Sequence, residues 1–433
     1  MFSTLDIDTV WAGHRVDFCL LTVEDRQYVA YYAEDRHMVV AFRTLDRESW
    51  HYFRPPSRQP GPPNYRASET STILGWDSHN YISLAEDGDG HLHLSGNMHC
   101  NGLTYFRSQQ PHDIDSLTQV SAMTGQDEEK CTYPQFLHDR KGDLIFHYRI
   151  GSSGSGDEIY NIYDLAIGSW RRLLDQPLTD GKGMMNAYMH EPVKGPDGHF
   201  HLSWVWRDTP DCATNHDLSY AHSPDLVNWF TAAGEAISLP ISIETPGVVV
   251  DPVPVQGGII NGTGKVGFDS RGRPILTYHK FDAAGLTQAY NARLEAGEWV
   301  IYRSSDWDYR WYFDGGGSII NEIDLGAVEP GDDGRLRLWY RHVKAGNGLW
   351  HLDEEKLRPQ RVEAGYSPVP PALMEVESDF PGMEVNWRED DGCSPDPATR
   401  FALRWEALPP HRDRPRSGPL PPAGRLKLYT LSA

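Results

Sequence analysis

The sequence predicts an all-β protein with a single domain, a seven-bladed β-propeller. Apolar runs are short and alternate with polar residues, and helical periodicity is almost absent. A turn followed by an alternating strand also recurs along the chain. The recurring segments include "DGDGHLHLSG", "DRKGDLIFHYR", "GPDGHFHLSWVWR", "DSRGRPILTYHK" and "GDDGRLRLWYR".

The turns indicate the number of blades. Their glycines are separated by 52, 56, 74 and 62 residues and are Gly90, Gly142, Gly198, Gly272 and Gly334. Irregular repeats of roughly this length, each with about four strands, are typical of propeller blades. Hairpins before the first of these turns and two strands near the C-terminus complete about seven blades. We expect one domain over residues 1–433, with the last blade closed by both termini; a pair of β-sandwiches fits so many repeats less well.

Composition excludes several classes of partner. The net charge of −21 argues against nucleic acid or an anionic membrane, because no basic field covers the protein. It leaves open an acidic oligosaccharide or polysaccharide, since one pocket can be locally positive. The five cysteines are far apart and form no CxxC pair, so neither a disulfide framework nor a cysteine-rich zinc site is expected.

The N-terminal sequence suggests a compartment. It shows no basic region followed by an apolar run, and no stretch of the chain approaches the roughly 20 apolar residues that span a bilayer. We therefore expect a cytoplasmic protein, unless a leader has been removed.

The segment "DSHNYISLAEDGDGHLHLSGNMH", residues 77–99, is rich in histidine. His91 and His93 alternate with leucines, which favours structural roles on a strand. The segment has neither a helical pair of histidines four residues apart nor a Cys/His quartet, so no metal ligand is predicted. The chemistry is expected to need no cofactor, and a structural metal ion stays open.

Candidate site residues lie at or beside the strands expected to be innermost, where blades converge on the propeller axis. They are His79, Asn80, His99, Tyr133, Arg149, Tyr188, His190 and Arg207, with His279 in "YHK" as a further residue that would line the channel. Five of them have a structural alternative. His79 and Asn80 would satisfy backbone groups in a turn. Tyr133 would be a core residue held extended by Pro134, while Arg149 and Arg207 would pair with Asp157 and Asp208.

The histidine-rich segment at residues 77–99, together with "TYPQF", "FHYRIGSSGSGD" and "VWRDTPDCATNHDLSYAHS", resembles the propeller polysaccharide lyases. That group includes ulvan lyases and rhamnosyl-glucuronate lyases, within a wider family that carries neuraminidase-type repeats. Two spacings carry the resemblance, because His99 follows His79 by 20 residues and Arg149 follows Tyr133 by 16. The resemblance extends from residue 30 to about residue 310.

The resemblance implies a lyase that cleaves a uronate-containing glycoside, of the rhamnose-glucuronate type, by β-elimination. His79, His99, Tyr133 and Arg149 are then the catalytic residues, and Asn80, Tyr188, His190, Arg207 and His279 bind substrate. The residue types suit this reaction independently. An arginine neutralises a carboxylate by a bidentate contact, and histidine and tyrosine exchange protons.

Among the catalytic residues, we favour His79 as the base and Tyr133 as the acid. Two other functions stay open, a rhamnosidase-like hydrolase and a non-catalytic propeller that binds carbohydrate. Hydrolysis would normally need two carboxylates across the scissile bond, whereas the motif region offers histidine, tyrosine and arginine.

Overall fold

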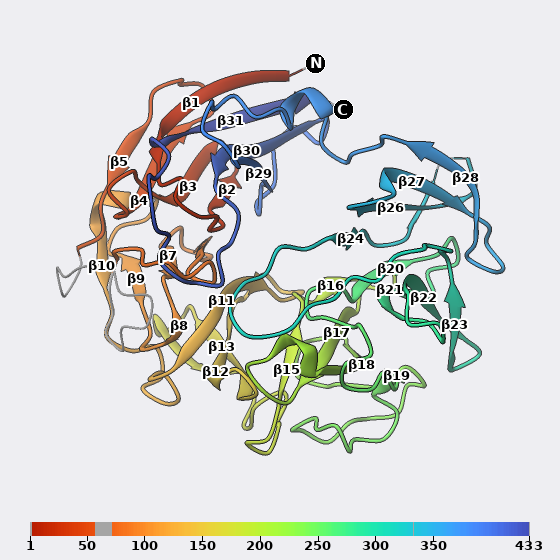
Figure 1. The fold of residues 1–433 in the computed structure, drawn as a ribbon. Helices are drawn as coiled ribbons and strands as arrows, with labels where there is room; N and C mark the ends of the chain where they lie inside the picture. The colour runs from red at the N-terminus through yellow and green to blue at the C-terminus, as the bar shows by residue number, and fades with distance from the viewer. Residues whose placement is uncertain (1, 57–71, 332, 433) are drawn as a thin grey trace.

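The computed structural model describes residues 2–56, 72–331 and 333–432. Within these ranges the strands form seven antiparallel sheets of four or five strands each. The sheets follow one another around a ring, and the two ends of the chain lie side by side (Figure 1). This arrangement confirms the predicted all-β, seven-bladed propeller.

Of the first three sheets along the chain, the third carries His99, Tyr133 and Arg149. One sheet consists of β2 (Cys19–Val23), β3 (Arg26–Tyr32), β4 (Met38–Thr44) and β5 (His51–Phe53). The next consists of β6 (Ile82–Glu86), β7 (Leu92–Gly96), β9 (Tyr105–Ser108) and β10 (Leu117–Gln119). The third consists of β8 (His99–Asn101), β11 (Cys131–His138), β12 (Leu144–Ser152), β13 (Ser155–Asp164) and β14 (Ser169–Arg172).

Three further sheets continue the ring. The fourth consists of β15 (Asn186–Met189), β16 (Val193–Lys194), β17 (Phe200–Arg207), β18 (Asn215–Ser223) and β19 (Val249–Asp251). The fifth consists of β20 (Lys265–Phe268), β21 (Pro274–Phe281), β22 (Thr287–Glu295) and β23 (Glu298–Arg303). The sixth consists of β24 (Ile323–Leu325), β25 (Glu329–Pro330), β26 (Leu336–His342), β27 (Gly346–Leu352) and β28 (Pro359–Ala364).

The seventh sheet joins the two ends of the chain. It consists of β29 (Glu384–Glu389), β30 (Thr399–Ala407), β31 (Gly424–Ser432) and the N-terminal strand β1 (Phe2–Val10). β1 pairs with β31, so the first strand of the chain is the outer strand of the last sheet. The helical segments among the described residues are three short 3₁₀ turns, η1 (Ile114–Ser116), η2 (Cys212–Thr214) and η3 (Pro371–Leu373).

The repeated turns have a common hydrogen-bonding pattern. Between β6 and β7, Asp87 Oδ1 accepts hydrogen bonds from the N–H groups of Asp89 and His91, at 3.0 and 2.9 Å. Gly90 completes the turn at a φ of 83°, in the left-handed region that favours glycine. The same pattern recurs at Asp139 and Asp269. The sequence repeat is therefore the turn that joins the innermost strand of a blade to the next strand.

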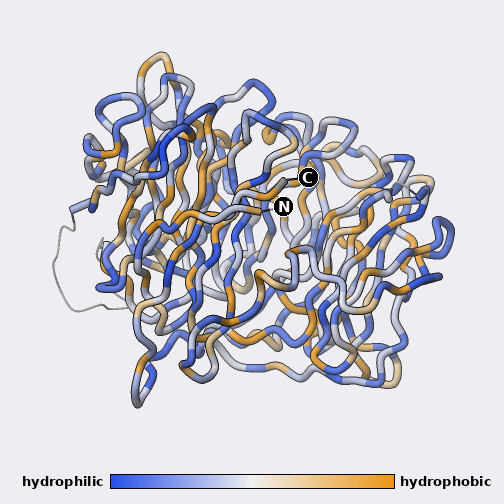
Figure 2. Tube along the Cα trace, turned by 90° about the horizontal axis from the view of Figure 1, so that it is seen from above, coloured by the Kyte–Doolittle hydropathy of each residue, from blue (hydrophilic) through white to orange (hydrophobic). Residues whose placement is uncertain are grey.

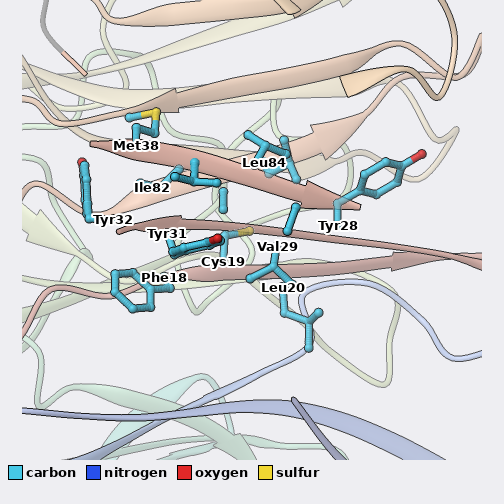
Figure 3. Packing of buried hydrophobic residues seen from close by; sticks show 14 of the residues in the cluster. Phe18, Cys19, Leu20, Tyr28, Val29, Tyr31, Tyr32, Met38, Ile82 and Leu84 are labelled. Carbon is cyan, nitrogen blue, oxygen red and sulfur yellow. The ribbon is translucent and has the colours of Figure 1, made fainter. Parts of the chain in front are cut away.

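Edge strands of neighbouring sheets meet around the axis. β2 packs against β6 and β29, and β6 packs against β11. Between sheets the core is apolar: Ile82 and Leu84 of β6 pack against Tyr28, Val29 and Met38 of the neighbouring blade (Figure 3). Each such fully buried side chain contributes about 1.5–3 kcal/mol, which holds adjacent blades together.

Hydrophobic residues follow the strands, and many loops at the upper and lower edges are hydrophilic (Figure 2). Among the described residues, no helix has the length and apolar character to cross a membrane. In the blades that carry it, the Asp–Gly turn lies at the end of an inner strand. The start of that strand and the end of its antiparallel neighbour therefore lie at the opposite edge, where Thr132 pairs with Arg149 and Asn186 pairs with Arg207.

Candidate active site

A cavity of about 210 Å³ opens at this edge, near the axis. It is lined by residues of several blades: His79, Tyr81, Tyr133, Gln135, His147, Glu158, Tyr188, Met189, His190, Asn261 and Gly262. Larger cavities lie elsewhere, among them two of about 570 and 590 Å³ near β4–β5 and beside β30 and two of about 500 and 300 Å³, and none of these four is lined by a residue selected from the sequence. We take the smaller cavity as the candidate active site because candidate residues from three blades line it: His79, Tyr133, Tyr188 and His190.

Asp77 joins the two histidines that the spacing singled out. Its Oδ1 lies 2.6 Å from His79 Nδ1, and its Oδ2 lies 2.5 Å from His99 Nδ1. The two imidazole rings lie 4.3 Å apart between centroids. Since an ionised carboxylate only accepts hydrogen bonds, both Nδ1 atoms carry protons and both Nε2 atoms are left for chemistry.

The charges of this cluster are unequal. Burial opposes ionisation of Asp77, but the charge of His79 and the hydrogen bonds from both imidazoles outweigh it and lower the pKa of Asp77 well below its usual value. The pKa of His79 is raised overall. Burial acts to lower it, but the charge of Asp77 and the hydrogen bond to Asp77 outweigh the effect of burial. For His99, burial and then the charge of His79 lower the pKa. Asp77 therefore supports a positive charge on His79 rather than on His99.

Two bulges lie in the strands that carry Tyr133 and His99. β11 pairs Thr132 with Arg149 and Gln135 with His147, so one extra residue is inserted between them. Tyr133 lies in this bulge with a φ of 60°, which differs from the extended backbone expected before Pro134. Cys100, next to His99, has a φ of 58° at a second irregularity, between β8 and β11. Such left-handed backbone at non-glycine residues is costly and is concentrated at functional sites.

Tyr133 faces His79 on one side and Tyr188 on the other. Its ring centroid lies 5.8 Å from that of His79 and 6.2 Å from that of Tyr188. Burial, followed by the neighbouring Tyr188, raises the pKa of Tyr133 well above its ordinary value, although Arg149 and Arg207 act in the opposite direction. The hydroxyl of Tyr133 is therefore protonated at neutral pH.

Arg149 lies behind this wall rather than on it. Its side chain has no exposed surface, and its Cζ lies 4.9 Å from the ring of Tyr133 and 5.5 Å from that of Tyr188. Nη2 donates to Thr132 Oγ1 at 3.2 Å, but Nε and Nη1 have no partner among the described residues. This differs from the expected bidentate contact with substrate, because the two tyrosine rings cover the guanidinium.

The remaining substrate-binding candidates divide into two groups. Tyr188 and His190 line the cavity, and Arg207 lies behind Tyr188 with its Cζ 5.1 Å from that ring. Asn80 is buried and does not line the cavity; its backbone carbonyl accepts a hydrogen bond from the Tyr32 hydroxyl, and its side-chain Oδ1 has no partner among the described residues.

His279 is not brought to the site. It is fully buried, its Nδ1 bonds to the carbonyl of Gly258 at 2.8 Å, and its ring packs against Trp311. Burial lowers the pKa of His279 to about 4, as for a neutral core histidine. The expectation that it lines the channel is wrong, because alternation along β21 turns its side chain between blades.

The arginine pairings weighed from the sequence do not form among the described residues. Arg207 donates to the carbonyls of Thr209 and Pro210, and Asp208 instead bonds to His216. His93 is structural as expected, since it is fully buried between Asp87 and Tyr105.

Several residues of the site were not selected from the sequence. Asp77 had a usable signal, because it precedes His79 in "DSHN". Asp413 had none: it comes from the loop before β31, accepts a hydrogen bond from the N–H of Ser78 at 3.2 Å, and lies 3.5 Å from His79 Nδ1. Gln135, His147 and Glu158 also line the cavity, and hydrogen bonds join His147 to each of the other two.

Asp77, His79 and His99 also have the composition of a metal site, since one ligand atom from each lies within 4.8 Å of the others. Two imidazoles and a carboxylate are ligands that suit Zn²⁺. However, each Asp77 oxygen already accepts a hydrogen bond from one imidazole, so these three groups are satisfied as an acid–base cluster.

Comparison with known proteins identifies the family of this chain. A family model described as a BNR repeat-containing family member matches residues 26–307. The chain belongs to this BNR repeat family. The match extends over the blades that supply His79, His99, Tyr133 and Arg149, which agrees with the neuraminidase-type repeats inferred from the sequence. A search of curated proteins finds no match.

Solved structures extend the likeness of this BNR repeat protein to nearly the whole chain. The polysaccharide lyase Uly1 is 15% identical with a TM-score of 0.62, over 97% of this chain and 90% of that one. A PL25 ulvan lyase is 14% identical with a TM-score of 0.58, over 93% and 92% of the two chains, and has also been solved bound to -[GlcA(1-4)Rha3S]-. At this identity the likeness shows the fold, which is the one predicted from the resemblance to propeller lyases.

Proposed function

We propose that this protein is a polysaccharide lyase that cleaves an acidic, uronate-containing saccharide by β-elimination. The saccharide is of the rhamnose–glucuronate type, and its uronate binds in the cavity. The observation that carries the proposal is the placement of His79 and Tyr133 on one cavity wall, with Asp77 behind the histidine and Arg149 behind the tyrosine. The saccharide bound by the PL25 ulvan lyase supports an acidic substrate.

In the proposed reaction, His79 Nε2 removes the proton from carbon 5 of the uronate. The electron pair of that bond forms the double bond between carbons 4 and 5, and the bond from carbon 4 to the glycosidic oxygen breaks. Tyr133 donates its hydroxyl proton to the leaving oxygen. Asp77 stabilises the imidazolium that forms on His79, and Arg149 stabilises the phenolate left on Tyr133.

Arg149 acts in this scheme at a distance. Its cation lies behind the rings of Tyr133 and Tyr188, so it attracts the substrate carboxylate through a low-dielectric wall where charges are weakly screened. Hydrolysis is less favoured, because Asp77 is bonded to two histidines and Glu158 is bonded to His147 at 2.7 Å. Neither carboxylate is free to take the two roles that a glycosidase needs.

The test of this function is ultraviolet absorbance during incubation with a panel of uronate saccharides. An unsaturated uronate absorbs, whereas the product of hydrolysis does not. Growth of the absorbance with a uronate substrate is the expected result. New reducing ends without a rise in absorbance would indicate a hydrolase. If no saccharide of the panel gives either reducing ends or absorbance, the remaining function is a non-catalytic propeller that binds carbohydrate.

Arg149 gives a graded prediction. Replacing Arg149 with methionine is expected to lower turnover by about 30-fold or more, because a desolvated cation–π contact contributes about 2 kcal/mol. Arg149→Lys keeps the charge behind the rings and is expected to lose less than Arg149→Met. Turnover with both variants, together with Tm, checks this. Equal losses in the two variants would favour a direct bidentate contact between Arg149 and substrate.

We further propose that the Asp77–His79–His99 cluster works without a metal ion. Dialysis against EDTA is expected to leave both Tm and product formation unchanged, because Asp77 already binds both imidazoles. Activity and Tm before and after dialysis check this. A loss of activity that Zn²⁺ restores would contradict it and would make the cluster a metal site.

A further inference from the structure

A cation that the proposed reaction does not use lies close to the candidate active site. Arg36 is in the turn between β3 and β4, and its Cζ lies 3.7 Å from the ring centroid of Trp11 and 4.4 Å from that of Trp76. The two indole rings lie 5.4 Å apart between centroids. The guanidinium therefore packs against both rings, and all three residues are partly exposed.

Trp76 links this group to the site. It directly precedes Asp77, which binds both His79 and His99. Three residues span at most about 11 Å, so the backbone of Trp76 lies within that distance of the backbone of His79. A saccharide that occupies the cavity and continues in this direction by the length of a disaccharide can therefore reach Trp76 and Arg36.

Arg36 has no counter-ion within the part of the chain that the structure describes. Its guanidinium forms neither an ion pair nor a hydrogen bond with those residues. The carboxylate of the preceding residue, Asp35, lies instead 2.6 Å from Arg54 Nη1 and 3.3 Å from His37 Nδ1. Burial lowers the pKa of Arg36 to about 10, so the group is a cation at neutral pH that has lost part of its hydration. An anionic ligand would compensate for that loss.

The other polar groups beside this arginine leave its charge uncompensated. His14 Nδ1 accepts a hydrogen bond from Trp11 Nε1 at 2.9 Å. Burial and then the charge of Arg36 lower the pKa of His14 to about 3, although Asp77 acts in the opposite direction, so the imidazole is neutral. The carboxylate of Asp77 is already bonded to two imidazoles. The positive charge at this place therefore has no anion committed to it among the described residues.

The backbone of Arg36 is held in a conformation that favours glycine. Its φ is 68°, its N–H donates to the carbonyl of Ala33 at 2.8 Å, and its carbonyl accepts from the N–H of Leu74 at 2.9 Å. Glycine would adopt this conformation at lower cost. An arginine kept there, with its side chain lying on two tryptophans and unpaired among the described residues, points to a role in binding a ligand.

We propose that Trp11, Arg36 and Trp76 form a second carboxylate subsite, which binds another uronate of the saccharide chain whose first uronate lies in the cavity. The planar guanidinium binds a carboxylate through two parallel hydrogen bonds, and the indole rings offer apolar surface to the sugar. The inference rests on the proposed function and deepens it by assigning a site outside the cavity. The two contacts act together, because the first raises the effective concentration of the second carboxylate.

The experiment compares two tetrasaccharides of alternating glucuronate and rhamnose. One carries both glucuronates, and in the other one glucuronate is replaced by glucose, which removes a carboxylate and keeps the length. Dissociation constants are measured calorimetrically with the Tyr133→Phe variant, which should bind without consuming either saccharide, and formation of unsaturated product is measured with the wild type. We expect the saccharide with two carboxylates to bind at least about tenfold more tightly, which corresponds to about 1.4 kcal/mol.

Substitutions in the Tyr133→Phe background assign this ratio to Arg36. Arg36→Gln should remove most of it, and Arg36→Lys should keep part, because lysine retains the charge but lacks the planar fork. Arg47→Gln is the matched control and should keep the full ratio, since Arg47 is exposed in the turn between β4 and β5, at the opposite edge of the same blade. Because both saccharides are measured on one protein, partial unfolding of a variant weakens both and leaves the ratio unchanged.

The outcomes separate the subsite from the function on which it rests. Equal binding of the two saccharides, or a ratio that Arg36→Gln leaves unchanged, overturns the subsite, while unsaturated product from the wild type still supports the lyase. A ratio that Arg36→Gln abolishes, without unsaturated product from either saccharide, supports the subsite and overturns the lyase. A ratio that Arg47→Gln abolishes equally overturns the assignment to Arg36, because the effect then reflects overall charge. Neither binding nor cleavage of either saccharide overturns both.

Discussion

Replacing His79 with asparagine is expected to abolish formation of the unsaturated product while the protein stays folded. The imidazole is the only part of His79 that accepts the carbon-5 proton in the proposed reaction, and loss of a general base typically costs about 10²–10⁴-fold. Its side chain is 23% exposed at the cavity, so little core packing is lost. Product absorbance and Tm are the measurements.

A matched control comes from the same segment. His91 is partly buried, and its Nδ1 bonds to the carbonyl of Ser108 at 2.9 Å, away from the cavity. His91→Asn should therefore retain activity. If His79→Asn retains full activity, His79 is not the base; if both variants lose activity along with Tm, the loss reflects folding rather than chemistry.

Replacing Tyr133 with phenylalanine is expected to reduce product formation by about 10²–10⁴-fold. The substitution keeps the ring that lies between His79 and Tyr188 and in front of Arg149, but removes the hydroxyl that protonates the leaving oxygen. Binding of substrate should change much less than turnover, because the cavity wall keeps its shape. Turnover, dissociation constant and Tm measured together check this expectation.

Tyr366→Phe is the control for this variant, since Tyr366 lines a different cavity, beside β26–β27. It should leave turnover unchanged. Normal turnover in both Tyr133→Phe and His79→Asn would remove the lyase and leave a carbohydrate-binding propeller. Loss in Tyr133→Phe that a saccharide with a better leaving group restores would support the role of Tyr133 as the acid.

Much of the architecture follows from local sequence. The Asp–Gly turns at Asp87, Asp139 and Asp269 depend on side-chain to backbone hydrogen bonds within four residues, so the same letters produce the same turn wherever they occur. Strand alternation is equally local, because successive side chains point to opposite faces. These two features are enough to predict an all-β chain of about seven repeated units.

The residues of the site could be selected from the sequence only in part. His79, His99 and Tyr133 are brought close together as the spacings implied, because antiparallel pairing places the starts of inner strands and the ends of their neighbours at one edge. His279 was selected on a similar aromatic and basic pattern and is instead a core residue. A sequence pattern does not determine which side chains of a strand point toward the propeller axis and which point toward the neighbouring blade.

The sequence by itself thus determined the fold class, through interactions that act within a turn or a strand pair, and the resemblance to propeller lyases selected three side chains that meet at the candidate site. Only the tertiary structure decided the rest. It covers Arg149 with the rings of Tyr133 and Tyr188, and places Tyr133 in left-handed backbone despite the following proline. It also brings Asp413 to Ser78, across 335 residues of chain. These outcomes depend on how loops of separate blades pack against one another, and neither residue spacing nor local propensity contains that information.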